Sequence, residues 1–187
     1  MPREHGLDAA ATVRRLREGG LRVIMAMGGN FAMATPDTPV VHEGLRACDP
    51  TVQISTKLNR SHTVTGREAL ILPCLGRTDR DQTKNGDQGV MVEDSQGQVH
   101  LSQGALTPPS ADCRSEVAIV AGVASRLLAD NPHLPWGDFA RDYDLVRDRI
   151  SRVVPGFENF NARVRRSNTP VAKGNRRALR ATLMERR

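Results

Sequence analysis

The sequence predicts an α/β fold: a three-layer sandwich around a short parallel, Rossmann-like sheet, with a β-hairpin insertion and C-terminal helices. Helix and strand patterns alternate over residues 8–73, which is typical of βαβ units. A polar loop follows each of the three strands expected there. The carboxyl ends of parallel strands meet at one edge of a sheet, where α/β proteins bind their ligands. We therefore expect these three loops to lie at the same edge and to form a binding site.

Caps, breakers and apolar periodicity predict each element in turn. Asp8 can cap the first helix, and Thr38-Pro39 can open the second, because Pro is favoured in the first turn. Residues 21–27 are almost continuously apolar and predict a strand buried on both faces. The elements expected over residues 8–73 are a helix at 8–18, a strand at 21–27, a helix at 38–48, strands at 51–56 and 69–72, and a helical turn near 64–67. The later elements are a polar loop at 75–88, a hairpin of 89–93 with 98–101, a helix from 110 or 112 to 131, and a helix at 136–153.

The charge is concentrated at the end of the chain. The 187 residues carry a net charge of +6, but residues 161–187 hold nine Lys and Arg against one Glu, a net charge of +8. The rest therefore carries −2, so its charge does not support nucleic-acid binding by the body of the protein. We expect a partial αβ domain at 1–130, a helical extension at 131–166 and a basic, disordered tail at 167–187.

The cysteines and the hydropathy pattern indicate a cytoplasmic protein. Cys48, Cys74 and Cys113 lie far apart and form no CxxC pair, so neither a zinc site nor an iron–sulfur cluster is expected. An odd number of scattered cysteines also argues against a disulfide framework. No apolar run approaches the length of a membrane span, and the N-terminus does not resemble a signal sequence.

The three loops supply the candidate site residues. Gly28-Gly29-Asn30 could let a ligand approach the backbone, although such a triplet is more often only a turn. Ser55, Thr56 and Asn59 could contact a nucleotide, or the loop could be a solvated one in which Ser61 or Thr63 caps a helix. Arg77 and Arg80 could bind phosphate or pair with neighbouring acids. No catalytic residue and no metal ligand is assigned, because His62 and Cys74 have no partner that sequence can place beside them.

Six strings of the chain carry a family resemblance: Gly28-Gly29-Asn30-Phe31, Ser55 to His62, Ala69 to Arg77, Val92-Glu93-Asp94-Ser95, Cys113-Arg114-Ser115-Glu116 and Gly156 to Phe160. Together they resemble the formate dehydrogenase-like molybdopterin oxidoreductases. The similarity is to the alpha-subunit branch, whose members often lack the N-terminal iron–sulfur cysteines, and it covers residues 20–166.

The resemblance implies a cofactor, bis-molybdopterin guanine dinucleotide, and a small substrate such as formate. It places Asn30 near the cofactor, and puts Ser55 and Thr56 where relatives have a Ser-Asp pair on the guanosine. Arg80 would replace a cofactor-contacting Lys, with Arg77 and Asn59 nearby. Because Thr56 stands in place of the acid, the guanine contact is the weakest point of the resemblance.

Members of that family are several times longer, so the resemblance implies that this chain is a fragment whose partners are the remaining domains of the same enzyme. Such a fragment is not expected to be active alone. A degenerate αβ binding module without cofactor is the alternative. The Arg-rich end, from Ser167, departs from the family pattern, and a frameshift is a hypothesis that sequencing of the downstream DNA would test.

Overall fold

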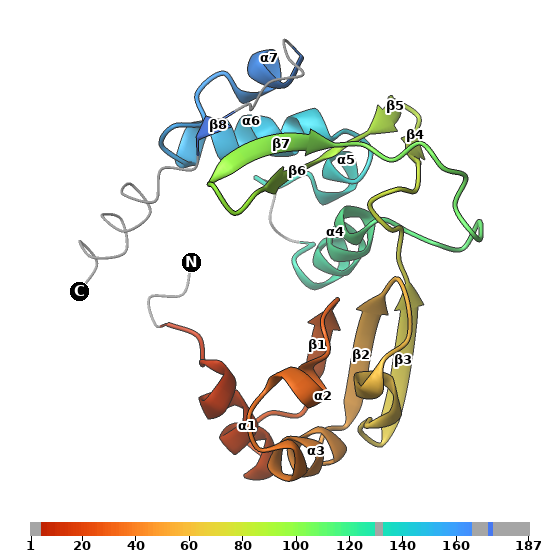
Figure 1. Ribbon diagram of the computed structural model, residues 1–187, viewed down its shortest axis with the longest axis vertical. Coiled ribbons are helices and arrows are strands. Elements are labelled where there is room, and N and C mark those ends of the chain that lie inside the picture. Colours follow the sequence, from red (N-terminus) through yellow and green to blue (C-terminus); the bar gives the residue numbers. More distant parts are fainter. Residues whose placement is uncertain (1–4, 130–132, 166–171, 174–187) are drawn as a thin grey trace. The chain divides into compact units, whose positions relative to one another are not determined.

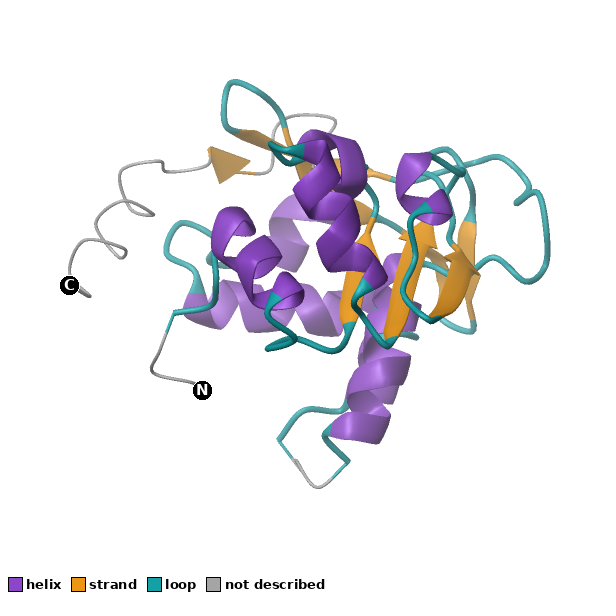
Figure 2. Ribbon diagram, turned by 90° about the horizontal axis from the view of Figure 1, so that it is seen from below, coloured by secondary structure: helices purple, strands orange, loops and turns teal. Residues whose placement is uncertain are grey.

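The computed structural model of the chain describes residues 5–129, 133–165 and 172–173. These residues fall into two units. The first unit comprises 1–74 and 110–116, and the second comprises 75–109 and 117–187. The chain is mixed α/β, with a short parallel sheet, antiparallel hairpins and C-terminal helices, as the sequence predicted. Figure 2 shows the helices in purple and the strands in orange. The division into 1–130, 131–166 and 167–187 stays a prediction.

The first unit contains the parallel sheet. Its strands are β1 (Ile24–Met27), β2 (Pro50–Ser55) and β3 (Glu68–Pro73), in the order β1-β2-β3. Both pairs are parallel, with Ile24 opposite Thr51 and Thr51 opposite Ala69. The three arrows point the same way in Figure 1, so their carboxyl ends share one edge. We call this edge, at Met27, Ser55 and Pro73, the carboxyl edge.

Helices and one hydrophobic cluster support this sheet. Asp8 caps the first helix, since its Oδ1 accepts a hydrogen bond from the Ala11 amide at 2.7 Å. The helices are α1 (Ala9–Arg17), α2 (Phe31–Ala34), α3 (Thr38–Arg46) and the 3₁₀ helix η1 (Arg60–Thr63). The buried cluster consists of Val13, Ala32, Val41, Leu45 and Val64, with Ile24, Phe31 and Val40 packed against it. Helix α2 was not predicted, and η1 replaces the turn expected near 64–67.

The prediction that β1 is buried on both faces was wrong. Ile24 packs against the cluster, whereas Met25 and Met27 are 44% and 42% exposed. Leu70, opposite Val52 in the neighbouring strand pair, is 51% exposed. A continuous apolar run shows that both sides of a strand are apolar, but not which elements of the chain cover them.

The second unit begins with two antiparallel hairpins. Strands β4 (Asp81–Thr83) and β5 (Gly86–Gln88) pair in a segment that was predicted to be a loop. Each of these strands has three residues, too few to show an alternation of apolar and polar side chains. Asn85-Gly86 is nevertheless a hairpin-turn signal, and Gly86 has φ +97°. The predicted second hairpin is confirmed as β6 (Val90–Glu93) with β7 (Gln98–Ser102).

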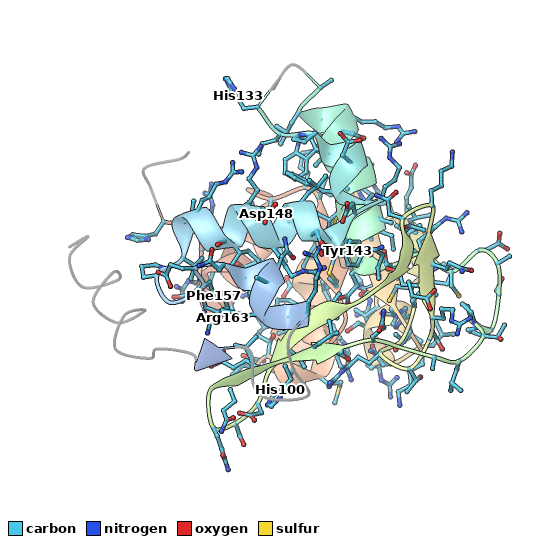
Figure 3. All side chains as sticks on the ribbon, turned by 90° about the horizontal axis from the view of Figure 1, so that it is seen from above. His100, His133, Tyr143, Asp148, Phe157 and Arg163 are labelled. Atoms are coloured by element: carbon cyan, nitrogen blue, oxygen red, sulfur yellow. The ribbon has the colours of Figure 1, made fainter. Side chains whose placement is uncertain are left out.

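Four helices complete the described part of the second unit. They are α4 (Glu116–Leu127), whose first residue belongs to the first unit, α5 (Trp136–Phe139), α6 (Tyr143–Val153) and α7 (Phe160–Arg165). The single helix predicted at 136–153 is therefore two helices. Asp142 separates them, because its Oδ1 accepts from the Asp144 amide at 2.9 Å and so caps a new helix. Figure 3 shows Tyr143 and Asp148 on α6, with Phe157 ahead of α7.

A small core joins α6, α7 and the β6–β7 hairpin. Phe160 is 1% exposed and Val99 is 6% exposed, and Met91, Ile150, Phe157 and Val164 pack against them. No helix in the described part of the chain is long and apolar enough to cross a membrane. Of the predicted basic tail, only Ala172–Lys173 is described, and it forms β8 beside β7. The rest of the tail lies outside the described residues.

Candidate functional site

Gly28 and Gly29 turn the chain away from the end of β1. Their φ angles are +63° and +68°, in the left-handed region that favours glycine. The Gly28 amide donates to the Ile54 carbonyl at 2.8 Å, which ties the turn to β2. A Cβ atom at either glycine would meet nothing within 4 Å. The backbone of this turn is therefore open to a ligand.

The loop after β2 begins with the predicted pair of hydroxyl side chains. Ser55 is the last residue of β2 and is 8% exposed, and its carbonyl accepts from the Cys74 amide at 3.1 Å. Thr56 and Lys57 follow it and are exposed. The structure thus places Ser55 within the sheet and Thr56 at the carboxyl edge, facing solvent.

Asn59 joins the loop after β2 to the loop after β1. Its Oδ1 accepts from the Ser61 amide at 2.9 Å, which caps η1. Its Nδ2 donates to the Gly29 carbonyl at 2.6 Å. Two predicted site residues that are 30 positions apart are therefore in direct contact.

Ser61 makes a second connection between the same two loops. Its side chain is buried, at 1% exposure. The Oγ atom accepts from the Ala32 amide at 3.0 Å and donates to Oδ1 of Asn30 at 3.1 Å. The sequence suggested Ser61 as a possible helix cap, but in the structure the residue that caps the helix here is Asn59. No local pattern marks Ser61, because its partners are about 30 residues away in sequence, in the segment after β1.

His62 completes the cap. Its Nδ1 accepts from the Asn59 amide at 3.0 Å, in a capping box with Asn59. Nε2 is buried and has no hydrogen-bond partner among the described residues. The ring is thus part of the loop's local structure.

Cys74 and Arg114 extend the carboxyl edge beyond β3. They form a short parallel bridge, in which the Arg114 amide donates to the Pro73 carbonyl at 3.3 Å. The guanidinium group is exposed and donates from Nη1 to the Ala111 carbonyl at 2.7 Å. Burial raises the pKa of the Cys74 thiol, with smaller contributions from Glu116 and Cys113. Sequence reasoning did not place Arg114 here, since 40 residues separate it from Cys74 along the chain.

Arg77 and Arg80 belong to the second unit. Nε of Arg77 donates to Oγ of Ser102 at 3.4 Å, and Nε of Arg80 lies 3.4 Å from Oδ2 of Asp87. Their proposed contact with a cofactor stays a prediction.

The two joined loops are rich in donors and free of carboxylates. Residues 28–30 and 55–62 include Lys57 and Arg60, both exposed, and contain no Asp or Glu. Amide, hydroxyl, ammonium and guanidinium groups suit phosphoryl and carbonyl oxygens. Among the described residues, no group of three or more His, Cys, Asp and Glu could hold a metal ion.

Comparisons with known proteins extend this picture. No protein-family model matches the chain. Over 164 residues it is 55% identical to proteins named "uncharacterized oxidoreductase" in Mycobacterium tuberculosis and Mycobacterium bovis, covering 88% of this chain and 21% of each relative. It is 42% identical to Protein YdeP of Escherichia coli, covering 88% of this chain and 22% of that protein. The chain thus spans about a fifth of the length of the curated relatives it matches. It is homologous to a segment of proteins that are named as oxidoreductases.

Proposed function

We propose that this chain forms part of the cofactor-binding site of a larger oxidoreductase. The observation that carries the proposal is the pair of loops joined at the carboxyl edge, where Asn59 and Ser61 hold the Gly28-Gly29-Asn30 turn. Homology to proteins named as oxidoreductases supports the reaction class. The other domains of that oxidoreductase are its partners.

We further propose bis-molybdopterin guanine dinucleotide as the cofactor, with formate or a similar small molecule as substrate. The resemblance in the sequence suggests this cofactor, and the donor groups of the two loops fit its phosphate and carbonyl oxygens. The open backbone at Gly28 and Gly29 leaves room for a close approach. When bound, the cofactor supplies two-electron transfer at its metal, and the residues of this chain bind and orient it.

Thr56 affects which base the site prefers. A carboxylate can accept hydrogen bonds from both the N1–H and the N2–H₂ groups of guanine, whereas one threonine hydroxyl cannot form the same paired contact. Neither of the two loops contains a carboxylate that could make this contact instead. We expect binding through the diphosphate, with little preference for guanine over adenine.

Isothermal titration calorimetry of the full chain with GDP tests the proposal. We expect a dissociation constant below about 1 mM, the range in which a few charge-assisted hydrogen bonds hold a small anion. Asn30→Asp keeps the shape of the side chain but replaces a donor with a negative charge, so it should weaken binding at least tenfold. Gln82→Glu adds the same charge at an exposed position of the second unit and serves as the matched control.

The second candidate is a binding module that has lost its cofactor. Absence of binding to both GDP and the extracted pterin cofactor at high micromolar concentration would favour it. Equal weakening by Asn30→Asp and Gln82→Glu would show that only net charge matters and would contradict the proposed site.

A further inference from the structure

We propose that Ser61 is a positioning residue that fixes the side-chain amide of Asn30 with its NH₂ group turned outward at the carboxyl edge, as a donor for a phosphoryl or carbonyl oxygen. The identity of that ligand rests on the proposed function, but the orientation of the amide does not. Ser61 and Asn30 both belong to the first unit, and their contact joins the loops after β2 and β1.

The burial of Ser61 determines which way the amide faces. Oγ already accepts a hydrogen bond from the Ala32 amide, and at 1% exposure the hydroxyl hydrogen has no water to bind. It therefore needs an acceptor, because a buried donor without a partner costs about 1–3 kcal/mol. Oδ1 of Asn30, at 3.1 Å, is that acceptor. The reversed amide would present Nδ2 to Ser61 and leave the hydroxyl hydrogen unpaired.

With Oδ1 held by Ser61, Nδ2 of Asn30 points away from this contact. No described residue accepts a hydrogen bond from it, and the side chain is half-buried rather than free in solvent. The neighbouring Gly29 is held in turn by Asn59. The donor is thus fixed beside the open turn of Gly28 and Gly29, where a ligand oxygen can reach it.

Side-chain amide signals of the full chain test the orientation without any ligand. The NH₂ signals of Asn30 are assigned by their loss in Asn30→Asp. In the wild type we expect a heteronuclear NOE close to that of the ordered backbone, and in Ser61→Ala a fall to values typical of a mobile side chain. Thr63→Ala is the matched control, because the one partner of Thr63 Oγ1 in the described part of the chain is the Arg60 carbonyl of the same 3₁₀ helix. An Asn30 amide equally ordered in Ser61→Ala would overturn the proposal.

A double-mutant cycle with GDP separates positioning from a general loss of structure. Ser61→Ala should raise the dissociation constant about fivefold in the wild-type background, the effect of one hydrogen bond, and less than twofold in an Asn30→Ala background. Equal effects in both backgrounds would show that Ser61 does not act through Asn30. A wild-type chain that binds no GDP would contradict the proposed function, while the NMR result would still decide the orientation.

Discussion

Replacing Asn59 by alanine removes two side-chain hydrogen bonds, one within the loop after β2 and one from that loop to the turn after β1. One is the cap of η1, the acceptor for the Ser61 amide at 2.9 Å, and the other is the 2.6 Å bond from Nδ2 to the Gly29 carbonyl. Loss of an Asn cap costs about 1 kcal/mol, and loss of the exposed hydrogen bond to the Gly29 carbonyl costs up to about another 1 kcal/mol. Asn59→Ala should therefore destabilise the first unit by about 2 kcal/mol. Asn59→Asp keeps the capping oxygen and loses only the donor, so it should cost about half as much.

The distribution of aromatic residues allows each unit to be followed by a different signal. The single Trp and single Tyr of the chain are Trp136 and Tyr143, both in the second unit. Fluorescence unfolding therefore reports the second unit, and amide hydrogen exchange in β2 reports the first. A loss of 2 kcal/mol corresponds to exchange that is about thirtyfold faster in the alanine variant. Exchange in β2 within twofold of the wild type, or equal losses in the Ala and Asp variants, would refute the assignment of the two bonds.

Three further predictions concern the first unit. Gly66→Ala should destabilise this unit by more than about 2 kcal/mol, because a Cβ atom would lie 2.5 Å from the Cys48 carbonyl oxygen. Gly6→Ala is the control and should leave hydrogen exchange unchanged, because a Cβ atom there meets nothing within 4 Å. The hydrogen bond from Arg22, together with the charge of Arg67, lowers the pKa of Asp49 below its ordinary value of 3.8. The stability that the Asp49 carboxylate contributes should therefore be present above pH 3.8 and be lost as the pH falls through the lowered pKa. An NMR titration of Asp49 with a midpoint at or above 3.8 would contradict this. Burial raises the pKa of the Cys48 and Cys74 thiols, so iodoacetamide at pH 8 should modify the half-buried Cys113 first. Mass spectrometry that finds Cys48 or Cys74 modified before Cys113 would contradict this order.

The sequence was sufficient for the elements that local patterns mark. Asp8 and the alternation of helix and strand predicted α1 and the parallel strands β2 and β3, and the turn residues between 93 and 98 predicted the β6–β7 hairpin. The β4–β5 hairpin was missed although Asn85-Gly86 marks its turn, because its flanking strands have three residues each and no apolar face. The break between α5 and α6 was missed because Phe139, Tyr143, Val146 and Ile150 keep a helical spacing straight through Asp142, which caps the second helix.

The candidate site could be predicted only in outline. Gly28 to Asn30 and Ser55 to Asn59 were predicted at the same edge, because parallel strands align their carboxyl ends. The contact between Ser61 and Asn30 depends on the register of β1 against β2 and on the path of η1, which no local pattern encodes. Arg114 reaches the edge through a bridge to Cys74, a long-range pairing with no signal in the sequence.

The measurement that tests the central claim most directly is chemical-shift mapping of GDP on the full chain. We expect the largest amide shifts at Gly28, Gly29, Asn30 and Thr56, at the carboxyl edge. A cavity at the opposite end of the sheet provides the contrast, because its two arginines could also attract a phosphate. It has a volume of about 410 Å³ and is lined by Arg22, Asp49, Arg67 and Glu68. Shifts concentrated at that cavity, or no shifts at millimolar GDP, would contradict the claim that the joined loops form the binding site.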